Sequence, residues 1–174
     1  MGEIKPVQKV KLIIGEIYSN ENSMSSAELN LVELFGKIDA RTTQIPFDFS
    51  DYYVPEMGSA LFRKWISFKN LIDPEELSDI KNKTNKIEDS FAINGKRIIN
   101  LDPGYISAPN LVLASTKNFS HRIYLSSGIY AEITLIYKNR NFEFLPWTYP
   151  DYKSETALEF FKKIRSDYLK KAPA

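Results

Sequence analysis

The order of strand-like and helix-like segments in the N-terminal part of this chain constrains its fold more than any other feature. Two segments, residues 25–35 and 74–91, carry apolar side chains three and four positions apart, which predicts helices. Four others show apolar runs or alternation and predict strands, at residues 9–18, 41–49, 60–70 and 97–101. This β-α-β-β-α-β order is typical of the ferredoxin-like, split βαβ arrangement, which predicts both helices on one face of the sheet.

The starts of the two predicted helices are marked by different residues. Asp73 is a good N-cap, Pro74 suits the first helical position, and acidic residues follow in the first turn. In the earlier helix, Ser25 and Glu28 have the spacing of a capping box, so we expect the helix to start there. Its expected buried side carries Leu29, Val32 and Phe35.

The segment after residue 101 begins with residues that favour turns. Asp102-Pro103-Gly104-Tyr105 suits a type II turn, in which the glycine supplies the positive φ. Ser107 is then expected to cap a short helix that ends near Lys117. Two hairpins follow, and Ser154 opens a last helix.

These elements predict a single α+β domain over residues 1–174. Residues 9–101 form its ferredoxin-like core, and residues 102–174 extend it with an antiparallel hairpin or meander and a final helix. The sequence shows no internal repeat, linker or low-complexity segment that would divide the chain.

One C-terminal hairpin can be predicted in register. A three-residue loop, Ser126-Ser127-Gly128, places Arg122 opposite Glu132, whereas a two-residue loop would place Arg122 opposite Ile133. Because a one-residue slip changes the neighbours of every side chain, the three-residue loop with Gly128 at positive φ is favoured. The other predicted pairs are Leu125 with Ile129, Tyr124 with Tyr130, Ile123 with Ala131 and His121 with Ile133.

Composition and missing motifs exclude several kinds of site. The chain has no cysteine, which excludes disulfides and thiolate ligands, and its one histidine does not predict a zinc site. No G-x-x-x-x-G-K-[ST] sequence is present, so we expect no P-loop nucleotide site. The aspartates at positions 48, 51, 102 and 151 are better explained as turn caps than as magnesium ligands.

Charge and hydropathy bear on location and partners. The formal net charge is +1, which creates no global field to gather nucleic acid or an anionic membrane. The apolar run at residues 12–14 is too short for a signal peptide or a membrane span. With the absence of cysteine, these features predict a soluble, cytoplasmic protein.

His121 is the most informative single residue. The predicted register places it on the apolar face of its hairpin, and two interpretations stay open: a core histidine bonded to a backbone carbonyl, and a site histidine at the rim of a pocket. Lys117 and Arg122, within five residues of it, favour the second interpretation. In that site the two cations bind an anion, and Asp102 or Glu132 orients the imidazole.

The sequence therefore predicts a polar pocket that binds a small anionic ligand carrying a phosphate or a carboxylate. The candidate binding residues are Asp102, Tyr105, Lys117, His121, Arg122 and Glu132. Neither a metal nor a specific catalytic residue is predicted, so an enzymatic activity stays open.

Two other functions stay open. Arg63, Trp65 and Lys69 alternate along one face of a predicted strand, and RNA-recognition modules stack bases on an open sheet face of this kind. The RNP1 pattern is absent and the C-terminal elements would cover that face, so nucleic acid is the less favoured partner. The third function is that of a structural or partner-binding protein without a pocket.

Several short motifs together resemble one known family. They are NLDPGY at 100–105, SHRIYL at 120–125, GIYAEITL at 128–135 and PWTYPDY at 146–152, with FDF at 47–49, DYY at 51–53 and EMG at 56–58. From about residue 9 to residue 170 the chain resembles the prokaryotic family catalogued as domain of unknown function 4416. The resemblance implies no catalytic residue, and the missing phosphate loop does not support the GTP-binding label that some members carry. Polar residues amid aromatics in these motifs suit a pocket better than plain scaffolding.

Overall fold

The computed structural model of the protein describes residues 2–171 and has a mixed α+β architecture. One nine-stranded sheet has the order β2-β4-β1-β5-β6-β8-β7, with β3 paired to β4 and β9 paired to β8. Every pairing between its strands is antiparallel. The strands are β1 (Val10–Tyr18), β2 (Ile38–Arg41), β3 (Ile45–Pro46), β4 (Phe62–Ile72), β5 (Ile99–Ile106), β6 (Asn110–Ser115), β7 (Ile123–Ser126), β8 (Ile129–Lys138) and β9 (Asn141–Phe144).

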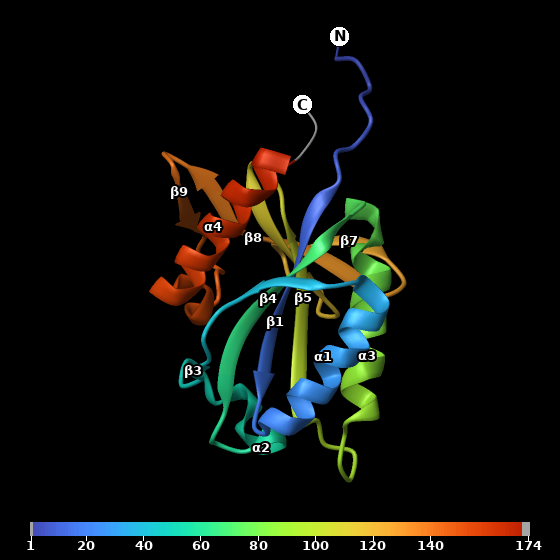
Figure 1. Ribbon diagram of the computed structural model, residues 1–174, viewed down its shortest axis with the longest axis vertical. Helices are drawn as coiled ribbons and strands as arrows, with labels where there is room; N and C mark the ends of the chain where they lie inside the picture. Colours follow the sequence, from blue (N-terminus) through green and yellow to red (C-terminus); the bar gives the residue numbers. More distant parts are fainter. Residues whose placement is uncertain (1, 172–174) are drawn as a thin grey trace.

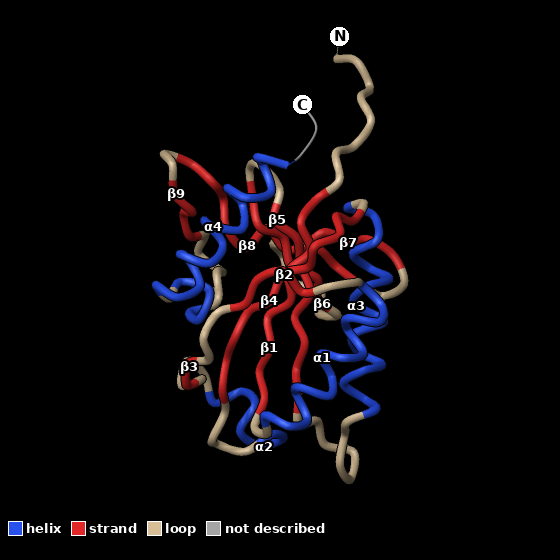
Figure 2. The backbone as a smooth tube through the Cα atoms, viewed as in Figure 1, coloured by secondary structure: helices blue, strands red, loops and turns tan. Residues whose placement is uncertain are grey.

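Helices cover both faces of the sheet. The helices are α1 (Glu21–Phe35), α2 (Val54–Met57), α3 (Leu77–Ser90) and α4 (Glu155–Lys171), with short 3-10 turns η1 (Asp51–Tyr53), η2 (Pro74–Glu76) and η3 (Pro150–Lys153). Helices α1 and α3 lie on one face, as predicted, and share a core with β1, β4 and β5 (Figures 1 and 2). Helix α4 packs on the opposite face, where its residues Phe161 and Ile164 join a second core.

Strand β1 is the centre of the sheet, as its apolar sequence predicted. All nine of its residues are buried, and it pairs with β4 on one side and with β5 on the other. The predicted second strand at 41–49 is displaced and divided, because β2 ends at Arg41 and β3 comprises only Ile45 and Pro46. Both short strands pair with the outer edge of β4, where a proline is tolerated.

Helix α1 starts earlier than predicted and buries a different stripe. Asn20 is its N-cap and accepts a hydrogen bond from the Ser23 amide. The buried residues are Met24, Ala27, Glu28 and Leu31, whereas Leu29 is 71% exposed. The helix is apolar on more than one side, so spacing alone does not select the buried stripe. An ion pair of 2.6 Å between Lys64 on β4 and Glu28 orients the buried side of α1 toward the sheet.

The start of α3 agrees with its sequence pattern. Asp73 and Glu76 form a capping box, in which the Asp73 amide donates to the Glu76 carboxylate over 2.7 Å. The first turn is the 3-10 turn η2, and α3 then buries one continuous stripe against the sheet. That stripe contains Leu77, Ile80, Thr84 and Ile87.

The predicted turn at 102–105 and the predicted helix after Ser107 are both wrong, because these residues belong to strands β5 and β6. Gly104 is required for a close approach of the two strands: a Cβ atom there would lie 2.3 Å from the Val112 carbonyl oxygen. The turn lies between the strands instead, where the Ser107 amide donates to the Asn110 carbonyl over 2.9 Å. Long-range strand pairing therefore overrides the local turn and cap preferences.

The β7–β8 hairpin keeps two predicted pairs with a shorter loop. Tyr124 lies opposite Tyr130, but Ser126 rather than Leu125 lies opposite Ile129, because the register shifts between Tyr124 and Ser126. Ile123 also pairs with Ala131, as predicted. The turn has positive φ at Ser127 (52°) and at Gly128 (79°), which is typical of a two-residue hairpin. The positive φ of Gly128 is confirmed, and the three-residue loop is wrong.

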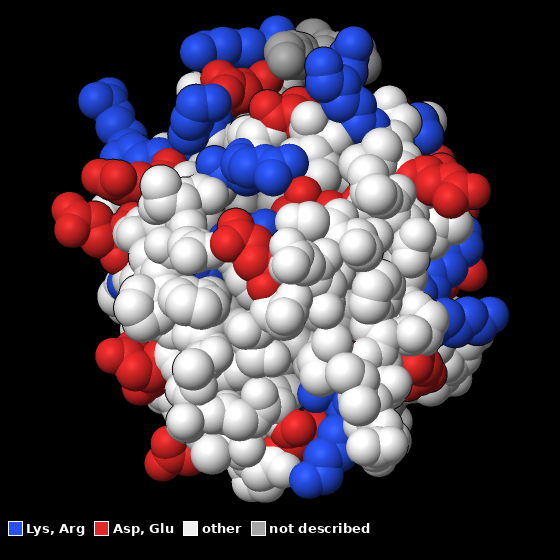
Figure 3. Space-filling view, turned by 60° about the horizontal axis from the view of Figure 1, so that its bottom comes forward, with Lys and Arg blue, Asp and Glu red and all other residues white. Residues whose placement is uncertain are grey.

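The face of β4 that was considered for nucleic acid is not open. Arg63 and Trp65 have no exposed surface. The Trp65 ring packs against Tyr152 at 5.6 Å and against Phe161 of α4 at 5.8 Å. This burial removes the basis for base stacking on that face. On the face shown in Figure 3, basic and acidic side chains lie near one another around a broad uncharged surface.

No helix within residues 2–171 combines the length and apolarity that crossing a bilayer requires.

Candidate functional site

The sheet opens between β5 and β6. The two strands pair only from Gly104 to Ile106 on the β5 side, and the earlier half of β5 has no neighbouring strand there. Side chains of α3 bond to this free edge instead: the Leu101 amide donates to Glu88 over 2.7 Å, and Lys81 donates to the Leu101 carbonyl over 2.8 Å. Helix α3 thereby satisfies the backbone where the sheet divides.

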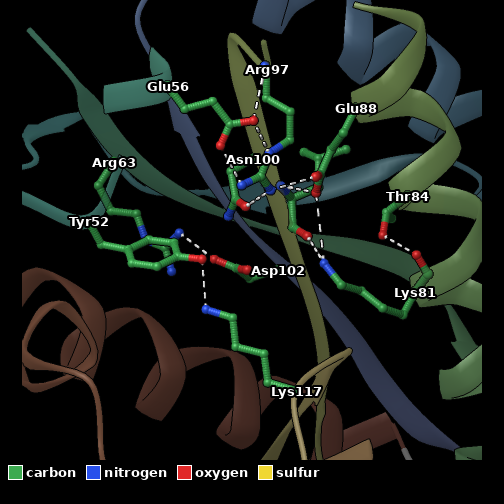
Figure 4. Close-up of polar contacts among 11 residues, drawn as sticks. Tyr52, Glu56, Arg63, Lys81, Thr84, Glu88, Arg97, Asn100, Asp102 and Lys117 are labelled. Atoms are coloured by element: carbon green, nitrogen blue, oxygen red, sulfur yellow. Dashed lines mark hydrogen bonds and ion pairs between the residues drawn. The ribbon is translucent and has the colours of Figure 1, made fainter. Parts of the chain in front are cut away.

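A cavity of about 680 Å³ occupies this opening. Its polar lining comes from β4, β5, the end of β6 and the start of β8, together with α3, and aromatic side chains come from η1 and η3. Figure 4 shows Tyr52, Arg63 and Lys117 around Asp102, with Lys81 and Glu88 on the α3 side. The volume is within the range of small-molecule sites in proteins.

Arg63 forms one wall of this cavity. Its guanidinium lies 3.0 Å from Asp102 and 3.0 Å from Asp151, and over the rings of Trp65 and Tyr152 at 4.8 and 5.1 Å from their centres. Burial raises the pKa of the Asp151 carboxyl, and the charge of Arg63 opposes that shift. Arg63 therefore holds two carboxylates together while its own charge is removed from solvent.

Gly15 makes room for the Arg63 guanidinium. A Cβ atom at Gly15 would lie 2.6 Å from Arg63 Nη2 and 2.8 Å from the Tyr152 hydroxyl. Because these atoms belong to packed, buried side chains, a larger residue at this position would displace them.

A second polar cluster surrounds Arg97. Its Nε and Nη2 donate to the two oxygens of Glu56 at 2.9 and 2.8 Å, and its Nη1 donates to Glu88 at 3.1 Å. The same Nη1 donates to Asn100 Oδ1 at 2.9 Å. Asn100 is only 4% exposed, and its Nδ2 has no hydrogen-bond partner within residues 2–171. Asn100 also lines the cavity.

Lys117 extends across the cavity from the end of β6 to η1. Its Nζ donates to the Tyr52 hydroxyl over 2.8 Å and lies 4.1 Å from the centre of that ring (Figure 4). Within the described part of the chain, Lys117 has no carboxylate partner.

Arg122 is buried and uses its N–H donors within the protein. Nε and Nη2 contact Glu132, and Nη2 also donates to the Tyr149 hydroxyl over 2.7 Å. Nη1 donates to Ser115 Oγ and to the Lys117 carbonyl, over 2.8 and 3.0 Å. Four of the five N–H donors of the guanidinium thus make hydrogen bonds within the protein, and Nη2 also forms the ion pair with Glu132.

His121 lies beside the cavity rather than in its lining. Its Nε2 lies 3.0 Å from Glu132, and its ring stacks on Trp147 with centres 4.8 Å apart. The carboxylate that orients the imidazole is therefore Glu132 and not Asp102. Tyr105 packs with the α3-side cores, so it does not contribute to the cavity. Of the six candidate residues, Asp102, Lys117, Arg122 and Glu132 line the cavity.

The sequence analysis missed Asn100, Arg97 and the pairing of Arg63 with Asp102. A signal for Asn100 was present, since it precedes Asp102 by two residues and side chains two apart share one face of a strand. That signal was hidden because Asp102 was assigned to a turn. Among residues 2–171, no cluster of three or more histidine, aspartate or glutamate side chains is arranged to hold a metal ion.

Comparisons with known proteins identify only the family. Searches of curated proteins and of solved structures found no match. The family model described as domain of unknown function (DUF4416) matches residues 8–168, which is nearly the whole chain. The chain therefore belongs to the DUF4416 family.

Proposed function

We propose that this protein binds a small molecule with one anionic group, a phosphate or a carboxylate, in the cavity between β5 and β6. The observation that carries the proposal is Lys117, whose ammonium group lies at the cavity without a carboxylate partner in the described chain. An unpaired ammonium next to a hydroxyl donor is a suitable site for such a group.

The other cations of the cavity are neutralised within the protein. Their carboxylate partners are Asp102 and Asp151 for Arg63, Glu56 and Glu88 for Arg97, Glu88 for Lys81, and Glu132 for Arg122. These four cations face five carboxylates, so the positive charge available to an anion is the local charge of Lys117 and not a net charge of the cavity.

Aromatic side chains supply the surface for the rest of the ligand. Phe47, Tyr52 and Tyr53 line one side of the cavity, and Phe119 and Tyr149 line another part. Rings provide large contact areas with few rotatable bonds, so they bind a ligand at a low cost in side-chain entropy. The cavity therefore combines one charged contact with apolar walls, as small-molecule sites commonly do.

His121 takes part in this proposal as a positioning residue. It contacts Glu132, which holds Arg122, and Arg122 donates to the carbonyl oxygen of Lys117. His121 thus supports the main chain of Lys117 through Glu132 and Arg122, and does not contact the ligand itself.

We infer in addition that β2, β4, β1 and β5 with α1 and α3 form a ferredoxin-like unit, to which the remaining strands were added. The antiparallel order β2-β4-β1-β5 and the location of both helices on one face support this relationship. We also propose a cytoplasmic location, supported by the absence of cysteine.

Calorimetric titration with ribose 5-phosphate, inorganic phosphate and short carboxylates tests the proposed function. We expect a phosphorylated or carboxylated probe to bind the wild-type protein and to bind Lys117→Gln at least tenfold more weakly. Lys37→Gln, which removes an exposed lysine on the opposite side of β4, is the matched control and should bind as the wild type does. Equal affinity of Lys117→Gln and wild type for every probe that binds, or no binding by any probe, contradicts the proposal.

A further inference from the structure

Beyond the anionic group, we infer that the inner end of the cavity recognises two adjacent hydroxyl groups, so that the ligand is a hydroxylated, sugar-like molecule with one phosphate or carboxylate. This inference rests on the proposed function, because it concerns the same cavity. The evidence for it comes from two side chains of β5 that line the cavity, Asn100 and Asp102. Asn100 offers a hydrogen-bond donor and Asp102 offers an acceptor.

Asn100 offers a hydrogen-bond donor at this end of the cavity. Its Oδ1 already accepts from Arg97, so Nδ2 is the atom left for a ligand. That Nδ2 is buried and has no hydrogen-bond partner within residues 2–171. A buried amide donor without a partner is costly to the fold, which favours a ligand that brings an acceptor to it.

Asp102 offers an acceptor beside that donor. Its Oδ2 accepts from Arg63 over 3.0 Å, whereas Oδ1 makes no hydrogen bond to the described part of the chain. The side chain is 27% exposed and lines the cavity. In its ion pair with Arg63 the carboxylate only accepts hydrogen bonds, and its ligand partner must therefore donate.

Asn100 and Asp102 are two positions apart on one strand, so they share a face of the sheet at a spacing of about 7 Å between α-carbons. A hydroxyl group both donates and accepts, which suits a site with one donor and one acceptor. Two hydroxyls on neighbouring carbons allow one oxygen to accept from Asn100 while the other donates to Asp102. This arrangement gives each of the two side chains the hydrogen-bond partner that it lacks.

The charge distribution favours neutral groups of the ligand beside Asn100 and Asp102, and its anionic group at Lys117. A second anionic group beside Asp102 would be repelled by its carboxylate, and a cationic group would lie close to Arg63 and Arg97. Neutral hydroxyls avoid both costs. The anionic group of the ligand then lies at Lys117, whose ammonium has no carboxylate partner in the described part of the chain.

Three probes on the unmodified protein test this inference by titration calorimetry. Ribose 5-phosphate carries adjacent hydroxyls and a phosphate. In 2-deoxyribose 5-phosphate one hydroxyl of the pair is missing, and inorganic phosphate has no sugar hydroxyl. We expect ribose 5-phosphate to bind at least tenfold more tightly than the deoxy compound, because a site built to bond a hydroxyl is left unpaired by an analogue without it. Equal affinities for the two sugar phosphates overturn the inference and leave the proposed function standing.

A variant locates the effect in the cavity. Asp102→Asn keeps the shape of the side chain and replaces an acceptor-only carboxylate, so the preference for ribose 5-phosphate over its deoxy analogue should fall at least fivefold. Asp79→Asn, which changes an exposed aspartate on α3, is the matched control and should keep the full preference. An unchanged preference in Asp102→Asn also overturns the inference. Absence of binding by all three probes overturns it together with the proposed function.

Discussion

Arg122 holds the main chain of Lys117: its Nη1 donates to the Lys117 carbonyl oxygen over 3.0 Å. The same guanidinium is bonded to Glu132, and the Arg122 side chain is only 2% exposed. Within residues 2–171, Lys117 is the one cation of the cavity lining without a carboxylate partner, and its main chain is bonded to this buried network. This relationship connects the stability of the β7–β8 end of the sheet to the geometry of the proposed ligand site.

Removing Arg122 should be costly to the fold. In Arg122→Met, the buried Glu132 carboxylate loses its main partner, and we expect the free energy of unfolding to fall by about 3–5 kcal/mol. Urea unfolding followed by circular dichroism measures this change. The double variant Arg122→Met/Glu132→Leu removes both charges and should recover part of the loss. A double variant as unstable as the sum of the two single variants contradicts this account.

Changes at His121 should affect the ligand less than changes at Lys117, because His121 acts through Glu132 and Arg122. We expect His121→Gln to remain folded and to weaken ribose 5-phosphate binding by less than Lys117→Gln does. His121→Ala, which also removes the stack on Trp147, should cost about 0.5–1.5 kcal/mol of stability. Titration calorimetry and urea unfolding measure both effects. If His121→Gln abolishes binding as completely as Lys117→Gln, the imidazole contacts the ligand directly.

Gly15→Ala should disturb the site by displacing the side chain of Arg63. The added methyl group would lie 2.6 Å from Arg63 Nη2, so the guanidinium and its ion pair with Asp102 must shift. We expect a loss of about 1–3 kcal/mol in stability and at least fivefold weaker binding of ribose 5-phosphate. Gly2→Ala, where no atom lies within 4 Å of the new methyl group, is the control and should change neither quantity. Wild-type affinity in Gly15→Ala would show that the position of Arg63 does not govern the site.

Glu16 should make the stability of the protein fall as pH rises. Burial raises the pKa of this carboxyl from 4.5 to about 8, against the opposing charge of Lys64, and neither of its oxygens makes a hydrogen bond within residues 2–171. Between these two values the folded protein binds a proton that the unfolded chain has released, so the free energy of unfolding decreases with pH in this window.

The variant Glu16→Gln removes that proton exchange. Its stability relative to the wild type should increase from pH 5 to pH 8, with a gain of about 1–3 kcal/mol at the upper end. Urea unfolding at pH 5, 6, 7 and 8 measures the difference, and other titrating groups contribute equally to both proteins. Curves for the two proteins that stay parallel across this range contradict a raised pKa for Glu16.

Local patterns predicted the elements whose structure depends on neighbouring residues. The apolar run of β1, the strand β4 and the N-cap at Asp73 all appear close to where the sequence placed them. The positive φ of Gly128 and the pair of Tyr124 with Tyr130 were also confirmed. In each case, residues a few positions apart along the chain are sufficient to select the conformation.

Prediction failed where distant segments compete with local preference. Pro103, Gly104 and Ser107 favour a turn and a helix cap by themselves, yet Gly104 instead permits β6 to approach β5. Similarly, the prediction of the buried side of α1 was wrong, because Glu28 faces the sheet and forms an ion pair with Lys64 on β4. Strand pairing and ion pairs between distant segments stabilise these conformations, and local sequence patterns do not reveal which distant segments come into contact.

The sequence by itself determined the residue types available to a site: a nearly neutral chain without cysteine, with Asp102, Lys117, Arg122 and Glu132 among aromatic residues. Only the tertiary structure decided which of these charges are paired. Arg122 pairs with Glu132, and Asp102 pairs with Arg63 on β4, two strands away in the sheet. Lys117 has no carboxylate partner within residues 2–171. The physical reason is that hydrogen bonds and ion pairs form over about 3 Å, a separation that only folding establishes.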